Sequence, residues 1–141
     1  MTAREITTKP TRVLIAEDDP DDRLMLQDAF DEACHQCRLQ FVRDGVELLN
    51  CLTVNPGTPL PDLVLLDLNM PLKDGRQALH EIRANPAFAK LPVVVMTTSN
   101  SEDDRNDCLA EGANDYLVKP ASYQALLSTV QALQSYWTPY D

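Results

Sequence analysis

Basic residues are scarce in this sequence, which has 12 lysines and arginines against 22 aspartates and glutamates and a formal net charge of −10. Nucleic-acid binding needs a basic face that releases counterions from the phosphate backbone, so we expect no nucleic-acid partner. The same charge disfavours an anionic membrane surface, so we expect no membrane partner either.

Long hydrophobic runs are also missing. No apolar stretch approaches the roughly 20 residues that span a bilayer, and the opening sequence MTAREITTKPTR lacks the hydrophobic segment of a signal peptide. We therefore expect a cytoplasmic protein. Its 141 residues suffice for one domain and are too few for a separate output module. We expect a flexible polar tail over 1–11, one domain over 12–137 and an aromatic extension over 138–141.

The four cysteines give little sign of metal or redox chemistry. Cys34 and Cys37 form a C-x-x-C pattern, but no second pair supplies the remaining ligands of a zinc site. The pair also falls at the end of an expected helix, where the negative end of the helix dipole raises a thiol pKa. We predict that these residues, with Cys51 and Cys108, are ordinary reduced cysteines.

Short apolar runs alternate with helical patterns along the chain. Strands are expected over 12–16, 39–42, 62–67, 91–96 and 115–118. Helices are expected from Asp19-Pro20 to about Cys34, over 46–52, over 75–84, from Ser101 to Gly112 and from Ser122 to Trp137. This alternation predicts an α/β fold: a doubly wound parallel sheet of five strands in the order 2-1-3-4-5, with helices on both faces.

Charged side chains follow three of these strands. Glu17 and Asp18 end the first strand, Asp67 ends the third, and Lys119 follows the fifth. In this topology the ligand crevice lies at the carboxyl ends of strands one and three, so these acids should meet. Single strand-end acids are commonly helix caps or solubilising groups, but a set of acids facing one lysine needs a cation to relieve its repulsion. Magnesium is the common choice where phosphate oxygens complete the shell.

A carboxylate in such a site can act as a nucleophile toward a phosphoryl group. Asp67 is the best candidate, because it ends the central strand beside the metal-binding acids. Thr97, at the end of the neighbouring strand, can donate its hydroxyl to the new phosphate, and Lys119 supplies positive charge.

The set Glu17-Asp18, Asp67-Leu68-Asn69-Met70-Pro71, Thr97 and Lys119-Pro120 resembles the receiver domain of two-component response regulators, across about residues 12 to 137. The resemblance implies the flavodoxin-like receiver fold. It also implies a phosphoacceptor that catalyses only its own phosphorylation and dephosphorylation, with Mg²⁺ as cofactor.

The resemblance assigns roles to the residues of the metal site. It implies that Asp67 is the phosphoacceptor, and that Asp18 and Asp67 bind magnesium through their side chains. Glu17 is expected to help through a water molecule, and Asn69 through its backbone carbonyl.

The resemblance also implies how the phosphoryl group is held and sensed. Thr97 and Lys119 are expected to bind its oxygens, and the bond between Lys119 and Pro120 is expected to be cis. Tyr116 matches the aromatic residue whose inward or outward rotamer follows activation. Movement of Thr97 toward Asp67 would free space for Tyr116 and remodel the face formed by the fourth helix, fifth strand and fifth helix.

Four other functions are weaker. A haloacid-dehalogenase-like phosphatase needs a second aspartate where this chain has Asn69, and an amide cannot act as its general acid. His80 faintly resembles a histidine-kinase phosphoacceptor, but it lies on a short helix and we expect a surface residue. A flavodoxin-like carrier needs a first loop that cradles phosphate, which three acids would repel. A scaffold receiver that is never phosphorylated would not need the complete set of reactive positions.

The partners are expected to be proteins. The resemblance implies a sensor histidine kinase, and the chain could alternatively shuttle phosphoryl groups to a histidine phosphotransfer protein. The stretch DLVLLDLNMPLKDGR, the Thr-Thr-Ser after the fourth strand and the terminal Tyr136-Trp137 resemble single-domain regulators paired with bacterial phytochrome kinases. Such regulators often form dimers, and we expect a homodimer through the fifth helix and the aromatic extension.

Overall fold

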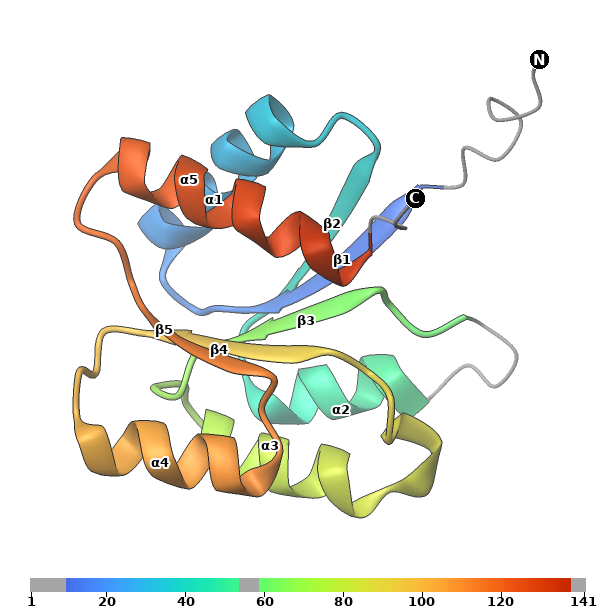
Figure 1. The fold of residues 1–141 in the computed structure, drawn as a ribbon. Helices are drawn as coiled ribbons and strands as arrows, with labels where there is room; N and C mark the ends of the chain where they lie inside the picture. Colours follow the sequence, from blue (N-terminus) through green and yellow to red (C-terminus); the bar gives the residue numbers. More distant parts are fainter. Residues whose placement is uncertain (1–9, 54–58, 138–141) are drawn as a thin grey trace.

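The computed structural model describes residues 10–53 and 59–137, and shows a sheet between two layers of helices (Figure 1). All strand pairs are parallel and follow the order β2-β1-β3-β4-β5, which confirms the predicted topology. The strands are β1 (Thr11–Ala16), β2 (Cys37–Val42), β3 (Leu63–Leu66), β4 (Val93–Thr97) and β5 (Asp115–Val118).

Helices α1 and α5 cover one face of the sheet, and α2, α3 and α4 cover the other (Figure 1). The helices are α1 (Pro20–Ala33), α2 (Gly45–Thr53), α3 (Gly75–Ala84), α4 (Glu102–Glu111) and α5 (Tyr123–Leu133), with 3₁₀ turns η2 (Pro86–Phe88) and η3 (Gln134–Tyr136). The predicted last helix is therefore α-helical only to Leu133. Most of the expected tail and the whole expected extension, 1–9 and 138–141, lie outside the described residues.

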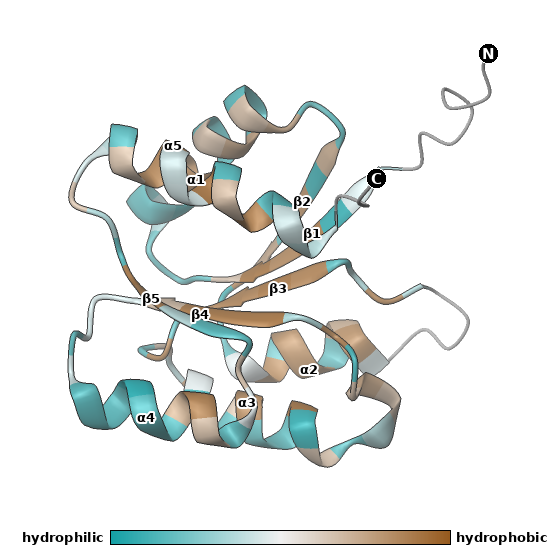
Figure 2. Cartoon of the chain, in the orientation of Figure 1, coloured by the Kyte–Doolittle hydropathy of each residue, from teal (hydrophilic) through white to brown (hydrophobic). Residues whose placement is uncertain are grey.

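The core has two parts, one on each face of the sheet. All residues of β3 and β4 are buried, because both faces are covered by helices, and these strands are coloured as hydrophobic in Figure 2. Side chains alternate along β1: Leu14 packs with the α2–α3–α4 layer, whereas Val13 and Ile15 pack with α1 and α5. Within the described residues, no helix is long and apolar enough to cross a membrane.

Polar side chains fix where most helices begin. Ser101 and Ser122 cap α4 and α5, each accepting a hydrogen bond from a backbone N–H in the first turn, and Gly112 ends α4 with a left-handed φ of 114°. Asp19 takes the cap position of α1, a position that aspartate commonly caps with its side chain, but it makes no side-chain cap bond. Its backbone N–H instead donates to Glu17 Oε2 at 3.0 Å, so the two acids stiffen the turn after β1.

The loop from β3 to α3 is packed tightly behind Asp67. A Cβ on Gly75 would lie only 2.3 Å from the backbone oxygen of Asp67, so a larger residue would displace the end of β3. Leu72 in the same loop has a φ of 62° and an 83% exposed side chain. The chain therefore brings the first turn of α3 against the strand end that carries Asp67.

The prediction of reduced cysteines is wrong for one pair. Cys34 and Cys37 form a disulfide between the end of α1 and the start of β2. The helix ends at Ala33 and the chain turns at Cys34, which brings the two Cα atoms to 5.5 Å, within the usual range for a disulfide. Cys51 and Cys108 are free, as predicted, with Cys108 buried.

Candidate functional site

The carboxyl ends of β1, β3 and β5 bring the predicted charged residues together. Lys119 Nζ lies 2.8 Å from Glu17 Oε1 and 3.0 Å from Asp67 Oδ2. It also lies 2.7 Å from Oδ2 of Asp22, in the first turn of α1. The ammonium group has three N–H donors, and each faces a carboxylate.

Burial makes these charges interact strongly. Glu17 and Asp67 are 2% and 5% exposed. Burial raises the pKa of Glu17, although its bond to Lys119 acts in the opposite direction. Burial alone would lower the pKa of Lys119, but its hydrogen bonds to Asp22, Glu17 and Asp67 outweigh this effect and raise it. The lysine is therefore fully charged at neutral pH.

Three of the acids have the spacing of a metal site. Glu17, Asp18 and Asp67 each offer a carboxylate oxygen, and these oxygens lie within 4.8 Å of one another. Carboxylate oxygens are the ligands that hard divalent cations prefer. Asn69 is exposed, and its backbone N–H donates to Asp67 Oδ1 at 3.1 Å, so this residue adjoins the cluster. The acids present thus fit a divalent cation.

Thr97 and Tyr116 occupy neighbouring buried positions. Thr97 ends β4 with no exposed surface, and its hydroxyl oxygen lies 3.4 Å from the backbone N of Ser99. The Tyr116 side chain is 2% exposed and its hydroxyl donates to the backbone oxygen of Ser99 at 2.9 Å. The aromatic ring therefore points inward, and the loop after β4 joins these two residues.

A network that the sequence analysis missed holds the same loop. Ser99 Oγ donates to Asp104 Oδ2 at 2.6 Å, and Arg76 of α3 donates to Asp104 Oδ1 at 2.7 Å. These two bonds, from Ser99 first and then from Arg76, lower the pKa of Asp104. Arg105 donates to the backbone oxygen of Tyr116 at 3.0 Å, so α4 contacts both the loop and β5.

Two further features differ from expectation. Asp22 lies in the first turn of α1, and no local signal in the sequence indicates its contact with Lys119, 97 positions away. The bond between Lys119 and Pro120 is trans, contrary to the expected cis bond, because no cis peptide occurs in the part of the chain that the structure describes. The trans form is the intrinsically favoured one for bonds to proline.

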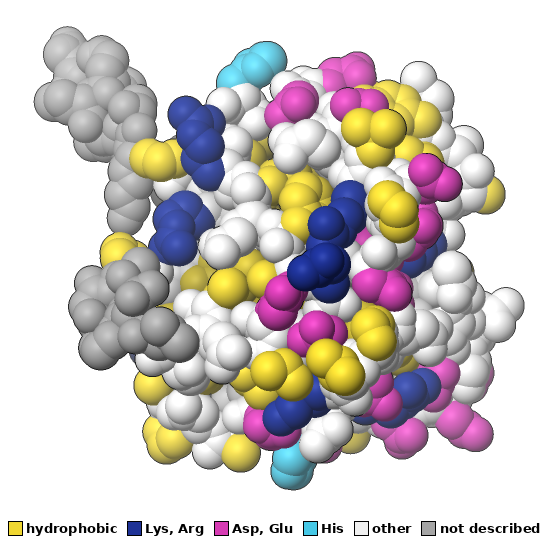
Figure 3. Space-filling model, turned by 180° about the vertical axis from the view of Figure 1, so that it is seen from behind, with side chains coloured by type: hydrophobic (Ala, Val, Ile, Leu, Met, Phe, Trp, Pro, Cys, Tyr) yellow, Lys and Arg dark blue, Asp and Glu magenta, His cyan; other side chains and the backbone are white. Residues whose placement is uncertain are grey.

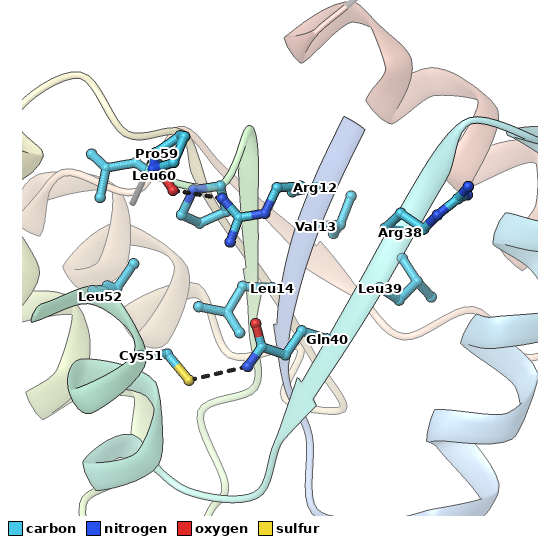
Figure 4. Close-up of a pocket in the computed structure, with 11 residues that line it drawn as sticks. Arg12, Val13, Leu14, Arg38, Leu39, Gln40, Cys51, Leu52, Pro59 and Leu60 are labelled. Atoms are coloured by element: carbon cyan, nitrogen blue, oxygen red, sulfur yellow. Dashed lines mark hydrogen bonds between the residues drawn. The ribbon is translucent and has the colours of Figure 1, made fainter. Parts of the chain in front are cut away.

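Other candidate features lie away from this cluster. His80 is exposed on α3, as predicted, with Nδ1 2.8 Å from Glu111 Oε2. A pocket of about 170 Å³ lies beside the starts of β1 and β2, at the amino end of the sheet. There Arg12 donates to the backbone oxygen of Pro59, and the side chain of Arg38 points away from it (Figure 4). The pocket lining holds no acid, so it offers no metal cluster.

The surface charge also differs between the carboxyl end and the amino end of the sheet. Figure 3 views the molecule from behind, so that the carboxyl ends of the strands lie toward its right-hand side. Acidic side chains gather on that half, whereas the half beside the grey residues shows mainly basic, apolar and uncharged groups.

Comparison with known proteins decides the family. The family model of the response regulator receiver domain matches residues 13–131. The chain belongs to this family.

Relatives of similar length support the assignment. The chain is 37% identical over 131 residues to the response regulator Rcp1 of Synechocystis sp., covering 91% of this chain and 89% of the relative. It is 35% identical over 134 residues to a probable methanogenesis regulatory protein, FilR2, of Methanothrix harundinacea, covering 94% and 86% of the two chains.

Solved structures agree in fold. The phosphorylated cyanobacterial phytochrome response regulator RcpA matches with a TM-score of 0.82 and 34% identity, over 91% of this chain and 94% of that chain. The Mn²⁺-bound form of Rcp1 matches with a TM-score of 0.80 and 37% identity, over the same shares. One receiver similar to this chain thus carries a phosphoryl group, and another holds a divalent metal.

Proposed function

We propose that this receiver accepts a phosphoryl group on Asp67 from a sensor histidine kinase in the cytoplasm, in a reaction that depends on Mg²⁺. The observation that carries the proposal is the buried cluster of Glu17, Asp67 and Lys119, with Asp18 beside it. A carboxylate nucleophile, a fixed ammonium and oxygen ligands for a cation are the parts that phosphoryl transfer needs. Because the relative RcpA is a phytochrome response regulator, a phytochrome-type kinase is the partner we propose.

The chain's own residues position the reaction. A carboxylate oxygen of Asp67 forms a bond to phosphorus as the P–N bond of the kinase phosphohistidine breaks, and the leaving imidazole nitrogen takes a proton from solvent. Lys119 and Thr97 would hold the phosphoryl oxygens, and Glu17, Asp18, Asp67 and the backbone of Asn69 would hold the magnesium. A bound magnesium supplies charge neutralisation and orientation of the transferred group. The only catalysis proposed is the chain's own phosphorylation and dephosphorylation.

Phosphotransfer tests this function directly. A phytochrome-type kinase autophosphorylated with radiolabelled ATP should transfer its label to the wild-type chain in the presence of magnesium. Asp67→Asn should receive none, because an amide is not a nucleophile toward phosphorus. Asp21→Asn, which removes an exposed acid from the first turn of α1, should be labelled like wild type. Labelling of Asp67→Asn at the wild-type rate would contradict the proposal.

We also propose a switch at the face of α4, β5 and α5. The Tyr116 ring points inward and its hydroxyl bonds the loop after β4, so this position is accessible to the folded chain and phosphorylation would raise its population. Two added negative charges would draw Thr97 toward Asp67. The bond from Ser99 to Asp104 is then a restraint on how far the loop can follow.

Replacement of Asp104 tests the restraint. Asp104→Asn weakens the bonds to Ser99 and Arg76, so the amide resonances of the loop and of β5 should shift in the unphosphorylated protein. Asp103→Asn removes an exposed acid from the same helix turn and should leave β5 unshifted. Nuclear magnetic resonance of both variants decides the matter, and equal shifts would refute the restraint.

A homodimer through α5 and the C-terminal residues remains a proposal. In the structure Leu126, Val130 and Leu133 are buried with α1 and the sheet, so they are not free for a partner. Half-buried Leu127 and Trp137 offer the remaining apolar surface. Light scattering of the full chain, compared with a chain that ends at Ser135, should show a dimer only for the former.

A second mode of action is a shuttle that passes the phosphoryl group to a histidine phosphotransfer protein. In the phosphotransfer assay described above, it would appear as radiolabel transferred from this chain to the phosphotransfer protein.

A further inference from the structure

Lys119 stands in the way of the cation that its neighbours are suited to hold. Two of its three carboxylate acceptors, Glu17 and Asp67, belong to the acid cluster with metal-site spacing. A divalent cation bound to those two acids would lie close to an ammonium group bonded to the same carboxylates. Like charges at such a separation repel strongly in a partly buried site. Cation binding therefore requires Lys119 to loosen its hold on Glu17 and Asp67.

Asp22 differs from the other two acceptors. It also bonds Lys119 Nζ, at 2.7 Å, but it lies in the first turn of α1 and does not belong to the acid cluster. Its side chain is 33% exposed, against 3% and 6% for Glu17 and Asp67. Asp22 can therefore stay paired with Lys119 while the buried acids turn to a cation.

We propose that Asp22 is a positioning residue that anchors Lys119 beside the site when a divalent cation takes over Glu17 and Asp67. The inference rests on the proposed function and deepens it. The Lys119 side chain is only 15% exposed, so an ammonium without a carboxylate partner there would be poorly solvated. By pairing with Lys119, Asp22 lowers the free energy of the cation-bound state and so raises the affinity of the site for a divalent cation.

The test is a thermodynamic cycle on cation binding, measured by isothermal titration calorimetry of the full chain with MnCl₂. Asp22→Asn should weaken Mn²⁺ binding by about threefold to tenfold, which lies in the lower part of the coupling range expected for residues in direct contact. Asp21→Asn is the matched control, because it removes an exposed acid from the same helix turn. Its affinity should stay within about twofold of wild type, because an exposed acid is screened by solvent.

A second background separates anchoring from simple charge. In Lys119→Met there is no ammonium to anchor, so adding Asp22→Asn should weaken Mn²⁺ binding no more than Asp21→Asn does. If Asp22→Asn costs the same affinity with and without Lys119, it acts through its own charge and the proposal is wrong. Equal affinities of Asp22→Asn and Asp21→Asn in the wild-type background would also overturn it. Circular dichroism confirms that each variant is folded.

Failure of the inference is distinguishable from failure of the proposed function. A wild-type chain that binds Mn²⁺ and accepts a phosphoryl group on Asp67, with no effect of Asp22→Asn, would overturn only the role of Asp22. A wild-type chain that binds no Mn²⁺ would overturn both.

Discussion

Two partly buried cations in this protein are bonded in opposite ways. Arg83 of α3 donates to three backbone oxygens, those of Gly112, Phe88 and Leu91, at 2.8–2.9 Å, and to the side-chain oxygen of Asn114 at 3.0 Å. All these acceptors are neutral. Lys119, at the carboxyl end of the sheet, donates only to carboxylates.

The pKa directions follow this difference. Burial lowers the pKa of Arg83, because no carboxylate opposes the loss of solvent. Carboxylates raise the pKa of Lys119 despite its burial. Arg83 joins α3 to the segments before β4 and β5, which is a structural role. Lys119 sits among more negative charge than it can neutralise, and that surplus is what a reactive site for a cation and a phosphoryl group requires.

The largest expected effect comes from removing the structural cation. Arg83→Met leaves the backbone oxygens of Gly112 and Leu91 without this donor. It also removes one of the two donors to the Phe88 backbone oxygen and to Asn114 Oδ1, so we expect a loss of about 3 kcal/mol in the free energy of unfolding. The loss should be the same with magnesium and with EDTA. Urea unfolding measured under both conditions checks this.

Removal of Lys119, the cation of the candidate site, should lower stability in a way that depends on magnesium. Lys119→Met leaves Glu17 and Asp67 buried and unpaired, so in EDTA we expect a loss of about 2 kcal/mol. Magnesium should restore most of it, because the ion can neutralise the same acids. Recovery of Arg83→Met by magnesium to the same degree would erase the distinction between the two cations.

The disulfide belongs with the structural features. Cys34 and Cys37 are three residues apart, so the loop they close is short and its reduction should cost only about 2 kcal/mol of stability. The bridge joins the end of α1 to the start of β2, at the amino end of the sheet. Dithiothreitol should therefore lower the melting temperature without changing the Mn²⁺ affinity. A changed Mn²⁺ affinity after reduction would show that the disulfide influences the candidate metal site and is not only a structural feature.

The smallest expected effect is a pH dependence of stability that comes from Glu17 of the candidate site. Burial raises the pKa of Glu17, so its protonated form is favoured in the folded state. Its contribution to stability is present below its ordinary pKa of 4.5 and is lost as the pH rises through the raised value. In EDTA, wild type should thus lose stability relative to Glu17→Gln between acidic and neutral pH. Thermal unfolding of both proteins across this range measures it, and a constant difference would refute it.

Much of the fold could be predicted, because its signals are local. The continuous apolar runs before Glu17 and Asp67 are typical of strands buried on both faces, and parallel pairing then brings their carboxyl ends to one edge of the sheet. The strand over 115–118 matches β5 at both ends. The topology therefore predicts that four charged residues lie together at this edge, and the structure brings them together: Glu17, Asp18, Asp67 and Lys119.

What escaped prediction depends on side-chain contacts between distant segments. Nothing near Asp22 in the sequence reveals the ammonium of Lys119, and nothing near Asp104 reveals Ser99 and Arg76 together. Acids are common in the first turn of a helix because they interact favourably with the helix dipole. The sequence therefore does not distinguish Asp22 or Asp104, which also bond a distant side chain, from acids that do not. The disulfide depended on where α1 ends and how the chain turns, which helix periodicity does not specify to a single residue.

The most direct test of the account is labelling of Asp67 by acetyl phosphate. The full chain is incubated with acetyl phosphate in magnesium or in EDTA, reduced with borohydride, and mapped by peptide mass spectrometry. Borohydride converts an aspartyl phosphate to homoserine, so the account predicts homoserine at position 67 with magnesium and unchanged aspartate in EDTA. Homoserine at Asp18, hydroxynorvaline at Glu17, or equal conversion of Asp67 in EDTA would contradict it.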